Sequence, residues 1–356
     1  MRAIRPLIAT AAALIIAWAC SRTPSAPSPV AGAKAPGGPT VTGVRVSGPS
    51  RVAPGETASF TATATYSDGS SKDVTASASW SPPGDRTWQP IYFTGAGTAL
   101  GANRGEIDVS ASQDGKYGSL HVLVLENGTF KLSGVVAESS GRLVSSVAID
   151  VVAGTGAGLH ATTDSLGRYA LYGVAGQIQL RVSAEGFAPQ THDLVVTADE
   201  TATPFALEPK EAPADVSGTW TMTLTPSPSC PPGLPDIARG RTYQIQFVQQ
   251  GTGLKLAITS PTLKVFNAGE DSGTVFGSQV QFTFIGDTDY GDWSSTDLID
   301  QLSPTQSLGF DGTVRGTAGG SELRGSLSGD IVYWEVPSYA PQWYCRATDH
   351  VVTLRR

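Results

Sequence analysis

The chain has 356 residues, a net charge of −7 and 15% charged residues. Its length is enough for two to four domains with separate hydrophobic cores, and its 41 Gly and 24 Pro residues favour strands and tight turns over helices. The acidic balance argues against non-specific nucleic-acid binding and against electrostatic docking to anionic lipid, because both rely on a basic surface.

Residues 1–19 have the pattern of an export signal. Arg2 and Arg5 precede a compact apolar run at 7–16, and small residues follow it. A membrane-spanning helix needs about 20 apolar residues, so this run is too short to cross a bilayer. The sequence therefore predicts export to an oxidising compartment.

Cys20 directly follows this segment. The arrangement resembles a bacterial lipoprotein signal, which implies a lipid anchor on Cys20 and a place in the cell envelope, with the outer membrane as the expected location. Ala17 and Trp18 depart from the usual residues of such signals, so ordinary cleavage nearby is the alternative. Residues 20–40 are rich in Pro, Ser, Ala and Gly, and they predict a disordered tether behind the anchor.

Residues 41–126 predict a β-sandwich, because short alternating apolar runs are separated by Gly, Pro and Asp turn signals. The segment resembles a group 2 bacterial immunoglobulin-like domain. The residues that carry this resemblance are Pro54-Gly55-Glu56-Thr57, Tyr66-Ser67-Asp68-Gly69-Ser70, Asp73-Val74-Thr75 and Trp80. We expect Trp80 and Trp88 to lie in the core, with an exposed aromatic contact at Trp88 as the alternative.

Residues 127–209 predict a second sandwich. Asp164 to Gly167 has the composition of a hairpin turn, and an alternating strand starts at Tyr169. The segment resembles the carboxypeptidase regulatory-like domain, a small transthyretin-like sandwich, in residues 132–136, 147–151, 164–171 and 186–187. In that family the domain accompanies catalytic or transport modules, so the resemblance implies no protease activity. A fold shared with some carbohydrate-binding modules is an analogy at the level of the fold.

Residues 210–214 form a linker, and residues 215–356 predict an antiparallel β-barrel. Alternating apolar residues and glycine-containing turns indicate about eight strands, which suits an up-and-down barrel. The Gly-Thr-Trp opening at 218–220 and the end at Leu354 resemble lipocalin-like and avidin-like barrels. That resemblance implies an alternative role as carrier of a small apolar ligand inside the barrel.

Cys230 and Cys345 remain as one pair once Cys20 is assigned to a lipid. In an oxidising compartment they predict a disulfide, with free thiols as the alternative. Cys230 follows the first barrel strand and Cys345 precedes the last, so both fall at the same end of a closed barrel. The spacing is poor evidence for zinc, and we expect no cofactor.

Asp287, Asp289 and Asp292 form the sharpest candidate metal site. Carboxylates at alternate positions can converge on a hard cation such as Ca²⁺, and Asp297 and Asp300 lie close enough in the chain to help. The twelfth position of the run lacks the bidentate carboxylate of an EF-hand. An acidic solvated loop is the alternative.

Residues 333–344 hold five aromatic residues and two prolines, and proline keeps the segment out of a central strand. Trp334, Tyr339, Trp343 and Tyr344 are therefore candidate contacts for a carbohydrate or a surface partner. The alternative is a lid that folds back on the barrel core and is fixed by the adjacent cysteine.

Catalytic motifs are weak in this sequence. The glycine–serine run at 325–329 resembles a nucleophile elbow but has Leu327 at its centre, and the four histidines lack metal-binding spacing. We expect a non-catalytic cell-envelope lipoprotein that binds or adheres through its barrel, with the two sandwiches as spacers. An unrecognised hydrolase is the remaining alternative.

Overall fold

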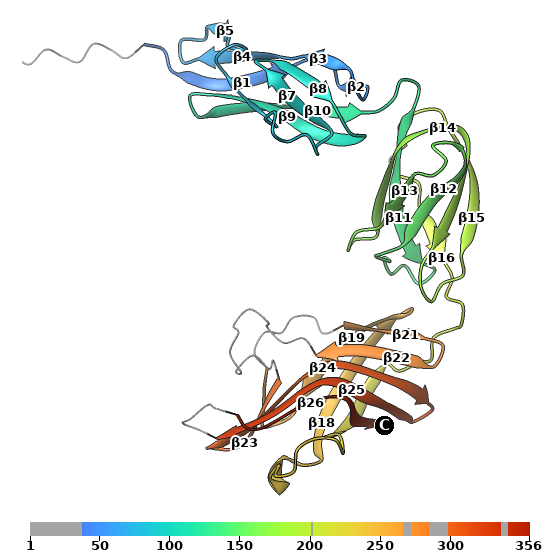
Figure 1. Cartoon of the computed structure of the whole chain (residues 1–356). Helices are drawn as coiled ribbons and strands as arrows, with labels where there is room; N and C mark the ends of the chain where they lie inside the picture. The colour runs from blue at the N-terminus through green and yellow to red at the C-terminus, as the bar shows by residue number, and fades with distance from the viewer. Residues whose placement is uncertain (1–37, 201, 266–271, 285–297, 336–340) are drawn as a thin grey trace, which may run out of the picture.

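The computed structural model describes residues 38–200, 202–265, 272–284, 298–335 and 341–356. Within these ranges the regular structure is β-strand, apart from one short 3-10 turn, η1 (Asp236–Ala238). The strands gather into three units that follow one another along the chain (Figure 1). The predicted all-β class is confirmed, whereas the predicted export signal and Cys20 lie outside the described residues.

The first unit encloses one core between three small sheets. Its strands are β1 (Val41–Ser47), β2 (Arg51–Val52), β3 (Thr57–Ser59), β4 (Thr61–Tyr66), β5 (Ser71–Asp73), β6 (Ser79–Ser81), β7 (Ile91–Gly95), β8 (Thr98–Gly101), β9 (Gly105–Gln113) and β10 (Lys116–Val124). The strand orders are β1-β4-β5, β2-β10-β9-β6 and β3-β8-β7. Phe60, Ile91 and Val109 are buried in the core, and the half-buried Trp80 packs on Phe93 with ring centroids 4.6 Å apart.

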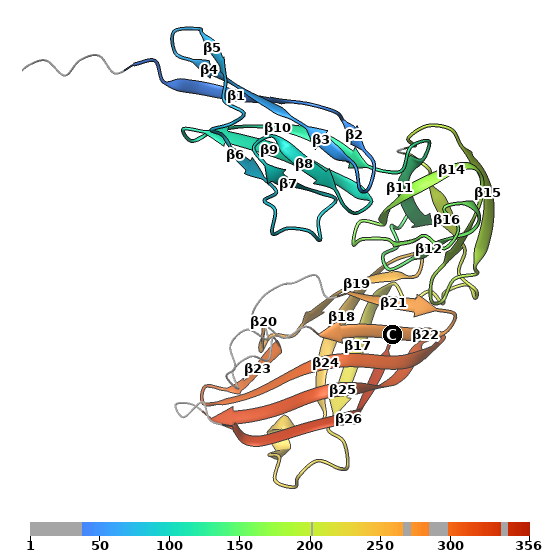
Figure 2. The same ribbon diagram turned by 45° about the horizontal axis from the view of Figure 1, so that its top comes forward.

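Trp88 does not belong to this core, so the core prediction for it is wrong. Its side chain is 67% exposed. The cause is local, because residues 82–90 leave the sheets between β6 and β7 and project as a loop (Figure 2).

The second unit is a six-stranded arrangement built around one long strand. Its strands are β11 (Phe130–Glu138), β12 (Ala148–Thr155), β13 (His160–Thr162), β14 (Arg168–Ser183), β15 (Gln190–Val196) and β16 (Phe205–Leu207), in the order β13-β12-β14-β11-β16, with β15 paired to β14. The first part of β14 pairs with β11, and its later part pairs with β12 and β15. β14 therefore joins the two halves of the unit.

The hairpin before β14 forms as the sequence predicts. Asp164 Oδ1 accepts hydrogen bonds from the backbone N–H groups of Leu166 (2.9 Å) and Arg168 (2.8 Å). Gly167 has a φ of 67°, a conformation that side chains with a Cβ rarely adopt. The turn thus depends on an aspartate acceptor and a glycine at fixed positions.

The third unit is a closed antiparallel barrel of eight strands, as predicted (Figure 2). Its sheet contains β17 (Gly218–Thr225), β18 (Arg241–Gln250), β19 (Gly253–Thr259), β20 (Leu263–Val265), β21 (Ser272–Phe276), β22 (Gln279–Phe284), β23 (Leu298–Ser303), β24 (Gln306–Gly319), β25 (Glu322–Glu335) and β26 (Pro341–Arg355). Pairing of β24 with β25 closes the ring, and β20 and β23 extend the wall beside the first half of β24.

Large side chains fill the described interior of the barrel. Tyr243 and Phe310 have ring centroids 5.1 Å apart, and Phe284 contacts Phe310 and Phe282 at 5.5 Å. Trp220 adds a fully buried indole to the same cluster. Rings in contact at these distances form a packed core, so this part of the interior is occupied by the protein itself.

A buried polar contact joins the second unit to the barrel. Glu138 is 4% exposed, and its carboxylate accepts hydrogen bonds from the backbone N–H of Thr252 (2.9 Å) and from Arg142 Nε (2.7 Å). Burial raises the pKa of Glu138, but the bonds from Thr252 and Arg142 outweigh it and lower the pKa below its usual value. Thr252 lies in the β18–β19 hairpin, which therefore marks the end of the barrel nearest the second unit.

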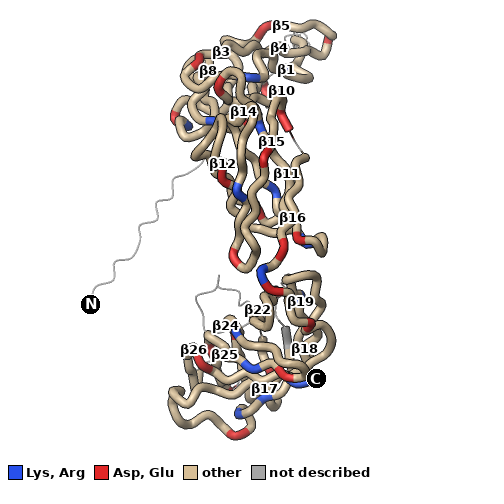
Figure 3. The backbone as a smooth tube through the Cα atoms, turned by 90° about the vertical axis from the view of Figure 1, so that its right-hand side faces the viewer, with Lys and Arg blue, Asp and Glu red and all other residues tan. Residues whose placement is uncertain are grey.

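A second polar contact joins the first and second units. Glu106 accepts hydrogen bonds from Lys131 Nζ (2.6 Å) and Tyr172 Oη (3.0 Å), and Arg51 pairs with Asp199 at 2.7 Å. Acidic and basic residues are otherwise scattered over all three units (Figure 3). Within the described residues, no helix has the length and apolar character needed to cross a membrane.

Candidate functional site

The barrel end opposite the β18–β19 hairpin carries most of the candidate residues, and we call it the distal end. Residues 226–240 connect β17 to β18 there. Cys230 in this segment forms a disulfide with Cys345 of β26, as predicted. The bond spans 115 residues, which corresponds to a stabilisation of about 4.8 kcal/mol in the chain-entropy model.

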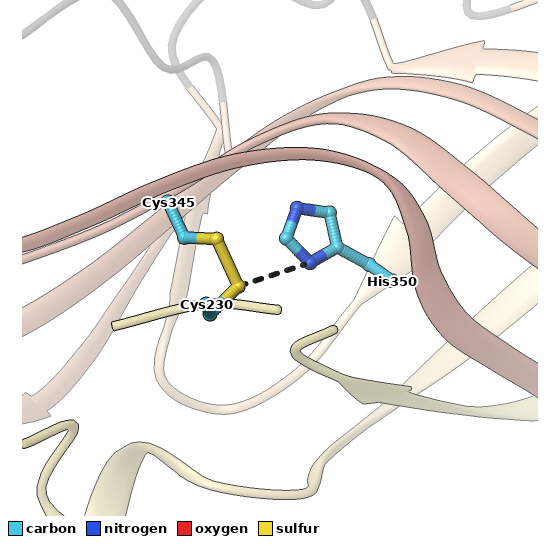
Figure 4. A group of neighbouring side chains, drawn as sticks. All are labelled: Cys230, Cys345 and His350. Carbon is cyan, nitrogen blue, oxygen red and sulfur yellow. Dashed lines mark hydrogen bonds between the residues drawn. A yellow bond between two sulfur atoms is a disulfide. The ribbon is translucent and has the colours of Figure 1, made fainter. Parts of the chain in front are cut away.

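His350 points toward this disulfide from β26 (Figure 4). Its Nδ1 accepts a hydrogen bond from the Ser227 backbone N–H (3.1 Å), so Nε2 carries the proton and donates to the Gly329 carbonyl (3.3 Å). Burial lowers the pKa of His350 below its ordinary value. The ring is therefore neutral at pH 7 and serves as a buried connector between three backbone segments.

Cys230, Cys345 and His350 have the composition of a metal site, with ligand atoms within 4.8 Å of one another. The two sulfurs are bonded to each other, and a disulfide offers no thiolate to a metal ion. This cluster is consequently structural.

A pocket of about 270 Å³ opens beside the disulfide. It is lined by Thr225, Pro226, Ser227, Cys230, Pro231, Pro232, Gly233, Leu234, Arg239 and Trp343. Trp343 is fixed in the wall, because its Nε1 donates a hydrogen bond to the Pro231 carbonyl at 2.8 Å. Arg239 is held at the rim by a bond from its Nε to the Leu234 carbonyl (2.8 Å). The volume is just under the ~300 Å³ at which small-molecule sites begin, so a ligand held there would be small.

Asp300 forms a second polar group inside the distal end. It is fully buried on β23, and its Oδ2 accepts hydrogen bonds from Arg241 Nε (2.7 Å) and Tyr243 Oη (3.1 Å) of β18. Its Oδ1 has no hydrogen-bond partner among the described residues. Burial, with the charge of Asp300 second, raises the pKa of Tyr243 far above its usual value, so the phenol keeps its proton.

The structure gives Asp300 a different role from the one suggested by the sequence. In the sequence it lay close enough to help a candidate calcium site, with an acidic solvated loop as the alternative; in the structure its Oδ2 accepts hydrogen bonds from Arg241 and Tyr243. Sequence reasoning missed this group because β18 and β23 are far apart in the chain and no local pattern connects them. Asp287, Asp289 and Asp292 lie outside the described residues.

The predicted aromatic contacts do not form one exposed face. Trp334 and Trp343 are each only 7% exposed, and the half-buried Tyr344 donates its hydroxyl to Asp330 (3.1 Å). Tyr339 lies outside the described residues. Trp343 lies in β26 and belongs to the barrel core cluster, and Trp334 lies in β25, so both indoles are buried within barrel strands. Trp343 nevertheless reaches the distal pocket as one of its walls.

Comparison with known families identifies one part of the chain. Residues 131–207 match the carboxypeptidase regulatory-like domain, which confirms that resemblance for the second unit. A search of curated proteins found no match. The family match covers the second unit and leaves the barrel, with its distal pocket, to be interpreted from its geometry.

Proposed function

We propose that this protein is a non-catalytic binding protein of the bacterial cell envelope. In this proposal Cys20 carries the lipid anchor, and the group 2 immunoglobulin-like and carboxypeptidase regulatory-like units hold the barrel away from the membrane. The barrel binds its ligand, a ring of a surface carbohydrate, in the distal pocket.

The observation that carries the proposal is the pocket beside the disulfide. Its walls are apolar where Trp343, Pro232 and Leu234 line it, and Arg239 stands at its rim. An apolar wall with a few polar groups at the edge matches the two faces of a sugar ring, one of C–H groups and one of hydroxyls. The site also lies at the end of the barrel opposite the joint with the second unit.

Internal pairing at the distal end supports binding over catalysis. Arg241 and Tyr243 both donate to Oδ2 of Asp300, and His350 is neutral and bonded at both ring nitrogens. Groups that are paired in this way hold the end of the barrel in shape. The packed aromatic interior likewise favours a site at the end of the barrel over a carrier site along its axis.

The test is to fill the pocket with an added indole. Pro232 is an exposed lining residue, so Pro232→Trp blocks the pocket with little cost to the core. Ile237→Trp is the matched control, because Ile237 is an exposed residue of the same loop that does not line the pocket.

Saturation-transfer NMR with methyl glycosides of glucose, galactose and N-acetylglucosamine provides the readout. We expect transfer to at least one glycoside in the wild type and in Ile237→Trp, and its loss in Pro232→Trp. Equal transfer in Pro232→Trp, or none in the wild type, would contradict the proposal.

A further inference from the structure

The loop at 82–90 of the first unit presents an exposed indole. Trp88 is 67% exposed, whereas the other described tryptophans are buried or half-buried. A large aromatic ring left in water forgoes the stabilisation that its burial would give. The exposure of Trp88 therefore does not stabilise the first unit, and a role in binding would account for it.

The backbone on both sides of Trp88 is held in place. Asn103 Nδ2 donates hydrogen bonds to the carbonyls of Thr87 and Gln89, each at 3.1 Å. The Gln89 N–H donates to the Arg86 carbonyl at 3.0 Å. One side chain thus clamps the residues that flank the indole, so Trp88 is displayed on an ordered loop, and a binder loses little entropy in fixing it.

The surroundings of Trp88 are polar. Asp85, Arg86 and Thr87 are exposed, and the Arg86 guanidinium carbon lies 5.8 Å from the centroid of the Trp88 ring. Among the described residues of the first unit, the other exposed large hydrophobic side chain is Tyr117.

Tyr117 belongs to a different part of the surface. It pairs with Ser112 near the C-terminal end of β9, whereas a Cβ on Gly105, at the start of β9, would lie 2.9 Å from Pro90 of the loop. The loop therefore ends at one end of β9 and Tyr117 lies at the other. Trp88 is a single ring and not part of an apolar patch.

A single exposed ring among hydrogen-bonding groups favours a sugar over a protein partner. The core of a protein interface is a cluster of apolar and aromatic side chains ringed by others that exclude water. A pyranose instead needs one flat apolar surface for its C–H face and polar groups for its hydroxyls. Trp88 supplies the flat apolar surface, and Asp85, Arg86 and Thr87 supply the polar groups.

We propose that Trp88 is a stacking platform for a pyranose ring of a glycan, with Asp85, Arg86 and Thr87 bonding to its hydroxyls. This site is separate from the distal pocket of the barrel and does not depend on it. It gives the first unit a binding role beyond that of a spacer.

The experiment is affinity electrophoresis of the exported chain in native gels that contain mixed-linkage glucan, xylan or mannan. The variants are Trp88→Ala, Trp88→Tyr and, as a matched control, Tyr117→Ala, which removes another exposed ring from the same unit. Each ring is exposed, so all three variants are expected to keep the wild-type thermal midpoint.

We expect at least one polysaccharide to retard the wild type. Trp88→Ala should raise the dissociation constant roughly tenfold, as loss of a stacked ring implies, whereas Trp88→Tyr and Tyr117→Ala should stay near the wild type. Absence of retardation in all three gels, or equal retardation of the wild type and Trp88→Ala, would overturn the proposal. Pro232→Trp, which blocks the distal pocket, should leave the effect of Trp88→Ala unchanged.

Discussion

At Asp300 the barrel holds a fully buried carboxylate, which would be costly without partners. Arg241 and Tyr243 reach it from β18, so the three side chains tie β23 to a strand that is not its neighbour in the sheet. The bonds from Arg241 and Tyr243 to Oδ2 offset part of the cost of burying this carboxylate.

We predict that Asp300→Ala lowers the free energy of unfolding by about 3 kcal/mol, because it leaves the half-buried Arg241 without its carboxylate. Urea unfolding followed by circular dichroism measures the loss. Arg324→Ala is the control, since it removes an exposed partner of Glu322 and should cost less than about 1 kcal/mol. Equal losses of unfolding free energy in the two variants would show that the buried group contributes no more to stability than an exposed ion pair.

His350 predicts how the stability of the barrel depends on pH. Its folded pKa is lowered by burial, so the unfolded chain takes up the proton first, near pH 6.5. Stability should therefore be complete above about pH 6.5 and fall as pH falls toward the folded pKa.

His350→Asn tests this dependence, because an asparagine oxygen can replace Nδ1 as acceptor for the Ser227 N–H. We expect the variant to lose less stability than the wild type between pH 7.5 and pH 5.5, a window around the unfolded pKa of about 6.5. Parallel pH profiles of the two proteins would rule out His350 as the source.

The roles of single residues were predictable where they depend on a local turn motif, or on the oxidising compartment that the export signal implies. The hairpin at Asp164 and the pairing of Cys230 with Cys345 are of this kind. The role of Asp300 is not, because its burial depends on which distant segments meet. The exposure of Trp88 is not either, because no local pattern shows that its loop projects from the sheets. An aspartate near other aspartates suggests calcium until the strand that faces it is known.

At the scale of elements, alternation of apolar residues predicts strands well, and the closed barrel follows from their number. The sequence did not predict that β20 and β23 extend the wall beside β24. The prolines of the aromatic segment were expected to keep it out of the sheet, yet Pro341 is the first residue of β26. Proline is tolerated at the start of a strand, so much of the segment lies in β25 and β26.

The disulfide ties the segment after β17 to β26, which are neighbours in the closed ring. We predict that Cys230→Ser combined with Cys345→Ser lowers the free energy of barrel unfolding by about 4–5 kcal/mol. The midpoint of urea unfolding, with and without a dithiol reductant, measures the effect. Reductant should shift the wild type to the position of the variant and leave the variant unmoved; an unshifted wild type would contradict the assignment.

At the scale of the whole molecule, the three units are joined by buried or partly buried polar contacts. The contact between Glu106 and Lys131 joins the first unit to the second, and the contact between Glu138 and Thr252 joins the second unit to the barrel. The second joint occupies the β18–β19 hairpin, so it leaves the distal end of the barrel free. This arrangement leaves two candidate binding sites, at Trp88 and at the distal pocket, in different units.

Hydrogen–deuterium exchange of the purified chain, with and without the three methyl glycosides, tests the central claim most directly. If the distal pocket is the binding site, peptides from residues 226–239 should be protected when glycoside is present, and the β18–β19 hairpin at the opposite end should exchange as before. Unchanged exchange across residues 226–239, or protection confined to the hairpin end, would contradict the account.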